Sequence, residues 1–420
     1  MNEINLPEHW DVIKLSNSQL FSFENGIWKG KKAPFEECAV VRNTNFTSDG
    51  YLDLTDVAVL PIEQRHLTKK SLKWGDIIIE RSGGGPEQPV GRVVFFDIND
   101  GTYCFSNFTS RLRVIDNSTI CTTYLFFYLL YFHASGQTRK LQKRTTGIRN
   151  LIFGDYKESG IPLPPLPEQR AIAHVLQTIQ EAKFTRQREI ALERERKAAL
   201  MDHLFSHGTK GEPRKQTEIG EIPKGWKVVE LKEIADLRRE NVKPEDNQNL
   251  NFVGLEHIDS GESILKRWGD ASTMKSAKNR FYPDDVLYGK LRSYLDKAVI
   301  AEMDGICSTD ILVFTANSKI VPRFLVYLLH TEVFVNHAVA TSTGISHPRT
   351  SWDSLGKFTL ALPPLSEQRA TAAVFQAIDE KTAALEREVE HLDGLFHAML
   401  DELMIGQRSA VPLIDTDMDV

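Results

Sequence analysis

The sequence predicts an α+β fold: two mixed α/β domains joined by two long antiparallel helices that form a coiled coil with pseudo-two-fold symmetry. Three observations predict this fold. The chain repeats itself, its variable regions contain short apolar runs between turn residues, and two segments with almost no Gly or Pro carry apolar residues at heptad spacing. The length of 420 residues suits this organisation, because a typical domain has about 150 residues.

The repeat has two sequence anchors. LPEHWDVIKL, which begins at Leu6, returns as IPKGWKVVEL from Ile222, a shift of 216 positions. PPLPEQRAIAHVLQTI, which begins at Pro164, returns as PPLSEQRATAAVFQAI from Pro363, a shift of 199 positions. Between the anchors, YLL occurs in both copies, as does a motif that reads TTGI in the first copy and STGI in the second. The two copies therefore have the same order of parts, and the second copy is shorter by 17 residues.

The variable region of each copy is predicted to form a mixed α/β domain. DIIIE at 76–80, VGRVVFF at 90–96 and ILVF at 311–314 lie between Gly, Asn and Asp, which is typical of short strands and turns. TTYLFFYLLYF at 122–132 is predicted as a buried helix, because it is much shorter than the roughly 20 residues that cross a membrane. The predicted boundaries are 1–163 for the first domain, 164–207 for the first helix, 208–221 for a linker, 222–361 for the second domain, 362–407 for the second helix and 408–420 for a disordered tail.

Each domain is followed by a long predicted helix with an apolar seam. The run from Ser366 to about Leu403 contains no Gly or Pro except Gly394. Its seam consists of Phe375, Ile378, Leu385, Val389, Leu392, Phe396, Met399 and Leu403. The first helix has apolar seam residues at both ends and a polar middle; the apolar ones are Ile172, Leu176, Ile179, Ile190, Leu200 and Leu204, and the polar ones are Lys183, Arg186, Glu193 and Lys197. A helix of about 40 residues is roughly 60 Å long, and two such helices that follow modules related by a two-fold axis must run antiparallel.

Composition and charge exclude several classes of protein. A formal net charge of −6 excludes a histone-like polycation, so a nucleic acid would have to meet a local basic face. The N-terminus has no secretory signal, and the composition, with 41% hydrophobic and 26% charged residues, differs from that of a membrane or disordered chain. Cys38, Cys104, Cys121 and Cys307 have neither metal-ligand nor disulfide-framework spacing. We therefore expect a cytoplasmic protein with reduced thiols, no metal site and no contact with membranes.

The order of the duplicated motifs resembles the specificity subunit of a type I restriction-modification system. The resemblance rests on P-L-P-P-L-P-E-Q-R and L-P-P-L-S-E-Q-R at the starts of two long helices, and on the LPxxW-type starts of two divergent domains. It extends from Leu6 to about Gln407. It implies two target-recognition domains, each of which reads one half of an asymmetric bipartite site in double-stranded DNA. It also implies two helices that space these domains and dock two methyltransferase subunits, with restriction subunits in the full bacterial or archaeal complex.

The resemblance assigns the chemistry to the partner subunits, so we expect this chain to be non-catalytic. An adenine-N6 methyltransferase of this kind would carry an Asn/Asp-Pro-Pro-Tyr/Phe motif and a Gly-rich loop for S-adenosylmethionine, and the sequence has neither. The phosphate-loop pattern GxxxxGK[ST] is also missing. S-adenosylmethionine, ATP and Mg²⁺ are therefore expected on partner subunits, and no cofactor is expected on this chain. The outer helix faces would bind methyltransferase helices, although charged outer faces are otherwise simply solvated.

Two segments of the first module are candidate DNA contacts. Arg and Lys bind phosphates, Arg pairs with guanine and Gln pairs with adenine. In RKLQKRTTGIR the candidates are Arg139, Lys140, Gln142, Lys143, Arg144, Thr145, Thr146 and Arg149. The alternative for this segment is a solvated helix end. In ERSGGGPEQPVGR the candidates are Arg81, Ser82, Gly83, Gly84, Gln88 and Arg92, and the alternative is an ordinary hairpin loop.

Two segments of the second module are also candidate DNA contacts. YGKLRSYLDK interleaves basic groups with tyrosines that could stack or wedge at bases, and TSTGISHPR contains the second-copy STGI motif. The candidates are Tyr288, Lys290, Arg292, Tyr294, Lys297, Thr341, Ser342, Thr343, His347 and Arg349. The alternative is that the tyrosines only pack within a strand.

Two other functions remain open at this stage. A coiled-coil scaffold whose variable domains bind proteins would show no sequence-selective DNA binding. A specificity subunit of a methylation-only or related defence complex would differ in its gene neighbourhood, which would lack a helicase-nuclease.

Overall fold

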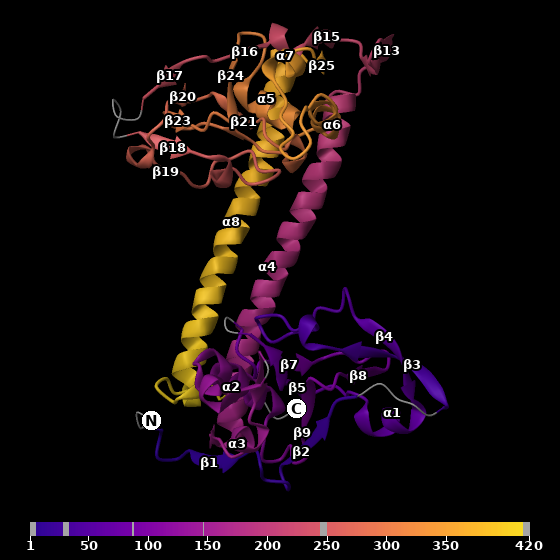
Figure 1. Ribbon diagram of the computed structural model, residues 1–420, viewed down its shortest axis with the longest axis vertical. Coiled ribbons are helices and arrows are strands. Elements are labelled where there is room, and N and C mark those ends of the chain that lie inside the picture. Colours follow the sequence, from indigo (N-terminus) through magenta and orange to yellow (C-terminus); the bar gives the residue numbers. More distant parts are fainter. Residues whose placement is uncertain (1–5, 28–32, 86–87, 146, 244–249, 415–420) are drawn as a thin grey trace. The chain divides into compact units, whose positions relative to one another are not determined.

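The computed structural model describes residues 6–27, 33–85, 88–145, 147–243 and 250–414. For Arg144, Thr145 and Thr273 it describes only the backbone. These residues form two compact units (Figure 1). Unit 1 consists of the described residues up to Thr185 and from Val389 onward, and unit 2 consists of those from Arg186 to Glu388. In the described part of the chain, no helix has the length and apolar character needed to span a membrane.

Unit 1 is built around an antiparallel sheet with strand order β2-β9-β5-β7. A second sheet, β4-β3-β8, contains the parallel pair β3-β8, and two smaller sheets have the orders β1-β12 and β10-β11-β6. The elements are β1 (Asp11–Lys14), β2 (Phe21–Asn25), β3 (Phe35–Val41), β4 (Ala58–Glu63), α1 (Gln64–Lys70), β5 (Asp76–Glu80), β6 (Ser82–Gly84), β7 (Val93–Phe96), β8 (Tyr103–Phe105), β9 (Thr109–Val114), α2 (Thr122–Ala134), β10 (Gln142–Thr145), β11 (Ile148–Leu151), α3 (Phe153–Lys157) and β12 (Gly160–Leu163).

The core of unit 1 lies around helix α2. The helix is apolar on all sides, and every residue from Tyr124 to Leu130 is buried, which confirms the prediction of a buried helix. The Tyr124 hydroxyl donates to the carbonyl oxygen of Pro162 at 2.9 Å, and the Tyr128 hydroxyl donates to that of Gly160 at 3.0 Å. These bonds join α2 to β12, the strand directly before the long helix.

Unit 2 repeats this plan. Its sheet β16-β24-β21-β22 has the antiparallel order of β2-β9-β5-β7, and β15 pairs with β25 as β1 pairs with β12. The YLL motif again lies in a buried helix, α5. The elements are β13 (Arg214–Thr217), β14 (Gly220–Pro223), β15 (Lys227–Glu230), β16 (Ala235–Leu237), β17 (Asn241–Val242), β18 (Asn251–Val253), β19 (Gly269–Asp270), β20 (Lys278–Phe281), β21 (Val286–Gly289), β22 (Ala298–Ile300), β23 (Gly305–Cys307), β24 (Ile311–Ala316), α5 (Pro322–Leu329), α6 (Glu332–Ala340), α7 (Trp352–Leu355) and β25 (Thr359–Leu362). The predicted mixed α/β class is confirmed for both units.

The two long helices are α4 (Leu166–His207) and α8 (Leu365–Met404). Every predicted seam residue of these helices is buried or partly buried. In unit 2, Lys197 of α4 pairs with Asp379 of α8 at 2.6 Å, and Glu193 pairs with Lys381 at 2.5 Å. Because the residue numbers rise on one helix as they fall on the other, the pair is antiparallel, as predicted. The polar middle of α4 is therefore matched by ion pairs with α8.

The two sequence anchors of each copy contact one another. In unit 1 the indole Nε1 of Trp10 donates to a carboxylate oxygen of Glu168 at 3.1 Å. In unit 2 Trp226 donates to Glu367 at the same distance. Both carboxylates are buried, so the bond to the indole provides a partner that they need. The Glu of E-Q-R therefore joins the helix start to the first strand region of its own copy.

The Gln of E-Q-R has the same role in both copies. The side-chain oxygen of Gln169 accepts a hydrogen bond from the backbone N–H of Cys121 at 2.8 Å, directly before α2. The side-chain oxygen of Gln368 accepts one from the backbone N–H of Val321 at 2.9 Å, directly before α5. Each Gln thus fixes the start of a long helix against the start of the buried domain helix.

Two predictions about connecting segments need correction. The predicted linker at 208–221 contains β13 and the first residues of β14, which form a hairpin. The prediction of a disordered tail was wrong for residues 408–414, because Ala410 is fully buried in the core of unit 1 and Val411–Leu413 form a 3-10 turn. Residues 415–420 lie outside the described residues.

Candidate nucleic-acid interface

In unit 1 a small sheet brings the two candidate segments together. Strand β11 pairs with β10 on one side and with β6 on the other. The Ser82 hydroxyl of β6 donates to the Asn150 side-chain oxygen of β11 at 2.6 Å. The segment at 81–92 and the segment at 139–149, which are far apart in the sequence, therefore share one surface.

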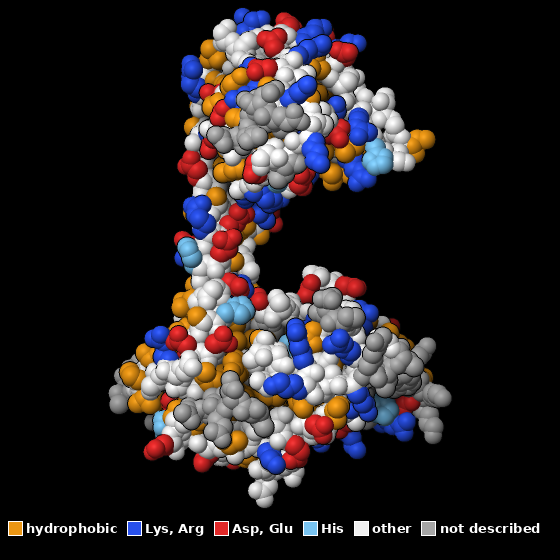
Figure 2. All heavy atoms as spheres, turned by 60° about the vertical axis from the view of Figure 1, so that its left-hand side comes forward, with side chains coloured by type: hydrophobic (Ala, Val, Ile, Leu, Met, Phe, Trp, Pro, Cys, Tyr) orange, Lys and Arg blue, Asp and Glu red, His pale blue; other side chains and the backbone are white. Residues whose placement is uncertain are grey.

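Several cations beside this sheet are available to a ligand. Arg139 and Lys143 are exposed and Arg149 is partly exposed, and none of the three has an ion pair among the described residues. Lys140 is exposed and donates to Gln137 at 3.3 Å. Figure 2 shows Lys and Arg side chains gathered on the visible face of unit 1. Local positive groups are thus present although the whole chain is negative.

Other candidates of this sheet have mainly internal contacts. The Arg81 guanidinium lies 4.4 Å from the Phe153 ring centre and donates to Ser110 at 3.3 Å, and burial lowers the pKa of Arg81. Gln142 donates to the carbonyl oxygen of Val90 at 3.3 Å. Gln88 is exposed. Arg144 and Thr145 are described only as backbone of β10, and Thr146 lies outside the described residues.

The two candidate glycines allow the tight local backbone of β6. Gly83 has a φ of +102°, which side-chain-bearing residues rarely adopt. A Cβ on Gly84 would lie 2.7 Å from the backbone oxygen of Gln88. Since Gly84 itself is buried, its role is to let two backbone segments approach each other.

Arg92 forms an internal ion pair. Its Nε and Nη2 atoms each donate to a Glu80 carboxylate oxygen at 2.9 Å, and Nη2 also donates to the carbonyl oxygen of Asn43 at 2.9 Å. Glu80 is only 1% exposed. The guanidinium therefore stabilises a buried charge, and this argues against the predicted DNA contact.

Replacing Arg92 with Ala is expected to lower the free energy of unfolding by about 2–3 kcal/mol, because the buried Glu80 carboxylate loses its counter-charge. Lys140→Ala is the matched control; it removes an exposed cation from the same region and should change stability by less than about 0.5 kcal/mol. Urea unfolding measures both. Unchanged stability of Arg92→Ala together with weaker DNA binding would instead assign Arg92 to the interface.

In unit 2 the two candidate segments also lie against each other. Leu291 and Thr343 each form an antiparallel bridge with Arg349. The backbone N–H of Arg292 donates to the carbonyl oxygen of Pro348 at 2.8 Å, and the N–H of Thr350 donates to that of Lys290 at 3.0 Å. The segments at 288–297 and 341–349 therefore form one continuous surface.

The exposed groups of this surface are basic, aromatic and apolar. Arg292 and His347 are exposed, Lys290 is partly exposed, and Tyr294 is 56% exposed. Arg292 has a φ of +55°, in the left-handed region. The Arg349 guanidinium pairs with Asp310 at 3.0 Å, and this carboxylate raises the pKa of Arg349.

The remaining candidates of unit 2 have contacts within the protein. Tyr288 is only 2% exposed and packs against Phe314 and Phe334, which argues against the predicted contact with bases; burial raises its pKa to about 12. Lys297 donates to the carbonyl oxygen of Leu255 at 2.6 Å. The remaining three, at the end of α6 and just after it, have local contacts: Thr341 and Ser342 donate to α6 carbonyl oxygens, and Thr343 bonds Arg349 through the backbone.

Sequence reasoning missed two exposed isoleucines at equivalent places. Ile148 is 45% exposed and Ile345 is completely exposed. Each follows a glycine with positive φ, Gly147 at +88° and Gly344 at +102°. The signal was present in the matching TTGI and STGI motifs, but an isoleucine suggests the core before it suggests a surface.

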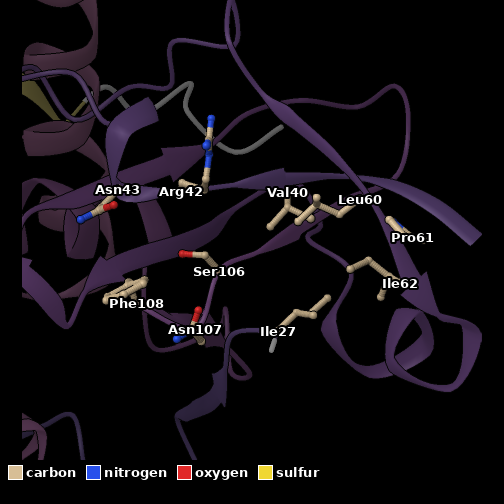
Figure 3. Close-up of a pocket in the computed structure, with 10 residues that line it drawn as sticks. All are labelled: Ile27, Val40, Arg42, Asn43, Leu60, Pro61, Ile62, Ser106, Asn107 and Phe108. Carbon is tan, nitrogen blue, oxygen red and sulfur yellow. The ribbon is translucent and has the colours of Figure 1, made fainter. Parts of the chain in front are cut away.

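Unit 1 also contains a cavity of about 470 Å³ beside β3 and β4 (Figure 3). Its lining is mainly apolar and consists of Ile27, Val40, Arg42, Asn43, Leu60, Pro61, Ile62, Ser106, Asn107 and Phe108. The Ser106 hydroxyl and Arg42 Nε are buried without a hydrogen-bond partner among the described residues. Among the residues that the structure describes, the lining includes no Asp, Glu, His or Cys.

Comparisons with known proteins show which proteins this chain resembles. The family described as type I restriction modification DNA specificity domain matches residues 7–194 and 223–392. The putative type I restriction enzyme MjaX specificity subunit of Methanocaldococcus jannaschii is 23% identical over 406 residues, which cover 96% of this chain and 94% of that protein. The type I restriction enzyme EcoDI specificity subunit of Escherichia coli is 25% identical, with 74% of this chain and 77% of that protein covered.

A solved structure supports the fold. The crystal structure of the type I restriction-modification system S subunit from M. genitalium has a TM-score of 0.58 and 15% identity, and the match covers 95% of this chain and 96% of that one. The two stretches that match the family each cover most of one copy of the repeat found in the sequence. The chain therefore belongs to the type I restriction-modification DNA specificity family.

Proposed function

We propose that this chain is the sequence-reading subunit of a type I restriction-modification complex. Each unit binds one half of an asymmetric bipartite site in double-stranded DNA. The chain then directs two adenine-N6 methyltransferase subunits, and restriction subunits in the full complex, to that site. S-adenosylmethionine, ATP and Mg²⁺ bind to the partner subunits, and this chain contributes recognition without catalysis.

One observation carries this proposal. In each unit, two segments that the sequence marks separately as candidate contacts lie on the same surface. In unit 1 that surface is the sheet β10-β11-β6, and in unit 2 it is formed by 288–297 and 341–349. A recognition surface needs cations for phosphates together with groups for base edges, and both surfaces offer this mixture.

The exposed groups divide into two roles under this proposal. Arg139 and Lys143 in unit 1 and Arg292 in unit 2 neutralise phosphates and position each unit on the duplex. Ile345, two residues before the exposed His347, supplies an apolar contact that can distinguish a thymine methyl group. Once both half-sites are bound, the target adenines are flipped into the pockets of the methyltransferase subunits.

The variant Arg139→Ala/Lys143→Ala tests the phosphate contacts. Each phosphate contact contributes a slope of about −0.9 to log K against log salt, so we expect the slope to become shallower by about 1.8. The loss of affinity should be similar for all DNA sequences, because phosphates carry no sequence information. Fluorescence anisotropy of the complex with its methyltransferase, at several salt concentrations, measures both quantities.

Lys69→Ala/Lys73→Ala is the matched control, because it removes two exposed cations of unit 1 that lie outside the sheet β10-β11-β6. Its slope should equal that of the unmodified chain. An unchanged slope for Arg139→Ala/Lys143→Ala would contradict the proposed interface in unit 1.

A further inference from the structure

The cavity of unit 1 contains polar groups that the fold leaves without partners. Ser106 is 8% exposed, and its hydroxyl has no hydrogen-bond partner among the described residues. The side-chain amide of Asn107, which is partly exposed, also forms no hydrogen bond within the described part of the chain. In Figure 3 both side chains lie between Phe108 and the apolar Leu60. Because a buried polar group without a partner destabilises a fold, the hydroxyl of Ser106 indicates a ligand that completes its hydrogen bonds.

The cavity borders the candidate DNA interface of unit 1. The backbone N–H groups of Arg81 and Ser82 donate to the carbonyl oxygen of Phe108 at 2.8 and 3.2 Å. The side-chain amide of Asn43 donates to the carbonyl oxygen of Ser82 at 3.4 Å. A Cβ on Gly83 would lie only 2.8 Å from Nδ2 of Asn43. Phe108 and Asn43 line the cavity, so DNA on the sheet β10-β11-β6 would pass directly beside it.

The size and lining of the cavity suit a single nucleobase. Its volume of about 470 Å³ lies in the range of small-molecule sites. Leu60 and Phe108 are 44% and 41% exposed, whereas Val40 and Ile62 are buried, so the cavity reaches from the surface to the core. Apolar walls of this kind cover the faces of a flat ring, and the few polar groups bind its edge.

Thymine is the base that these groups fit best. The amide of Asn107 can donate to one carbonyl oxygen of thymine and accept from the neighbouring ring N–H. The hydroxyl of Ser106 can donate to the other carbonyl oxygen. Thymine also carries a methyl group, which suits the apolar lining. The cavity therefore offers partners for the ring edge and an apolar environment for the methyl group.

Unit 2 has the same backbone at this place but different side-chain chemistry. Ser308 occupies the position of Ser106, because each backbone N–H donates at 2.9 Å to the last residue of a parallel partner strand, β18 or β3. The hydroxyl of Ser308, however, accepts from the backbone N–H of Asp310 at 3.2 Å. Asp310 stands where unit 1 has Phe108, and it pairs with Arg349. The unpartnered hydroxyl and the aromatic ring are thus specific to unit 1.

We propose that the cavity of unit 1 binds a thymine that has left the DNA stack. Under the proposed function, on which this inference rests, a target adenine is flipped into a methyltransferase subunit and its thymine loses its partner. An unpaired base costs less to unstack than a paired one. Phe108 and the apolar lining cover the thymine ring, and Asn107 and Ser106 bind its edge. By holding the thymine, the cavity favours the flipped state of the adenine in the half-site that unit 1 reads.

A double-mutant cycle between the protein and the DNA tests this proposal. Ser106→Ala/Asn107→Ala removes both polar groups, and an abasic site replaces the thymine opposite one target adenine. Fluorescence anisotropy of each complex with the methyltransferase gives the ratio of the affinities for the thymine duplex and the abasic duplex. We expect this ratio to be about tenfold higher for the unmodified chain than for the variant, because only the unmodified chain binds the thymine edge. With the abasic site in the other half-site, the two chains should give equal ratios.

Two further variants make the test specific to the cavity. Leu60→Trp places a large ring at the exposed edge of the cavity and should lower the ratio as the double variant does. The control Asn99→Ala/Thr102→Ala removes two exposed polar side chains of unit 1 outside the cavity lining and should keep the ratio of the unmodified chain. Circular dichroism should show no loss of stability for Ser106→Ala/Asn107→Ala, because the fold does not use these groups.

Equal ratios for the unmodified chain and Ser106→Ala/Asn107→Ala in both half-sites would overturn the cavity proposal. Equal effects of the variant on both half-sites would also overturn it, because the unpartnered hydroxyl belongs to unit 1 alone. Failure of the unmodified complex to bind any DNA sequence selectively would instead contradict the proposed function.

Discussion

Replacing Asp379 with Ala is expected to lower the free energy of unfolding by about 3–5 kcal/mol. The side chain of Asp379 is 8% exposed, and its carboxylate pairs with Lys197 of α4 at 2.6 Å. The carboxylate also accepts hydrogen bonds from the Tyr327 hydroxyl at 2.8 Å and from the Ser263 hydroxyl. Burial and the charge of Asp379 raise the pKa of Tyr327, so its hydroxyl stays protonated as a donor. Removing the carboxylate leaves a largely buried ammonium group without a counter-charge and two hydroxyls without their acceptor.

Urea unfolding followed by circular dichroism measures this effect, and two further variants separate its causes. Asp379→Leu/Lys197→Met removes both charges and should restore most of the lost stability, because no unpaired charge remains. Arg194→Ala removes an exposed ion pair with Glu386 and should cost less than about 1 kcal/mol. If Asp379→Ala cost no more than Arg194→Ala, the buried ion pair would not be a main determinant of helix pairing in unit 2.

Inserting four residues into α4 beside Arg194 is expected to abolish methylation at the original DNA site. Methylation should move to a site with the same two half-sites and a spacer longer by about one or two base pairs, because four helical residues add about 6 Å and a base pair occupies about 3.4 Å. An insertion of four is a stutter that heptad helices tolerate by local unwinding. The half-sites should stay the same because the insertion lies outside both proposed recognition surfaces.

Sequencing of methylated DNA from cells that carry the insertion checks this result. The control is an insertion of four residues at the exposed turn beside Gly101, which should leave both the half-sites and the spacer unchanged. A changed half-site with an unchanged spacer would show that α4 does not set the distance between the sites.

The helices and the repeat were predictable from the sequence because their signals are local and periodic. The near absence of Gly and Pro together with heptad spacing predicted a helix from Ser366 to about Leu403, and the structure has α8 at Leu365–Met404. The same motifs did not reveal that Trp10 binds Glu168, or that Trp226 binds Glu367. Those partners are more than 140 residues apart in the sequence, and no local pattern encodes such a contact.

The candidate interface was predictable only at the level of segments. The four segments predicted to contact DNA form two surfaces, but residue type did not reveal which side chains face outward. Arg92 is of a residue type that often contacts phosphates, but it pairs with the buried Glu80. Tyr288 was predicted to contact bases, but it lies in the core. Conversely, Ile345 is completely exposed although isoleucine usually belongs to a core. Side-chain direction depends on tertiary packing, which alternating or basic patterns do not specify.

Single-molecule sequencing can compare the DNA of cells that express this chain together with its neighbouring methyltransferase and the DNA of cells that lack only this chain. The proposed function predicts a split motif with methyladenine in both halves, present only when the chain is expressed. The motif would also identify the two half-sites and the spacer. Absence of new methylation, although the chain and the methyltransferase form a stable complex, would contradict the proposal that this chain directs the methyltransferase to DNA.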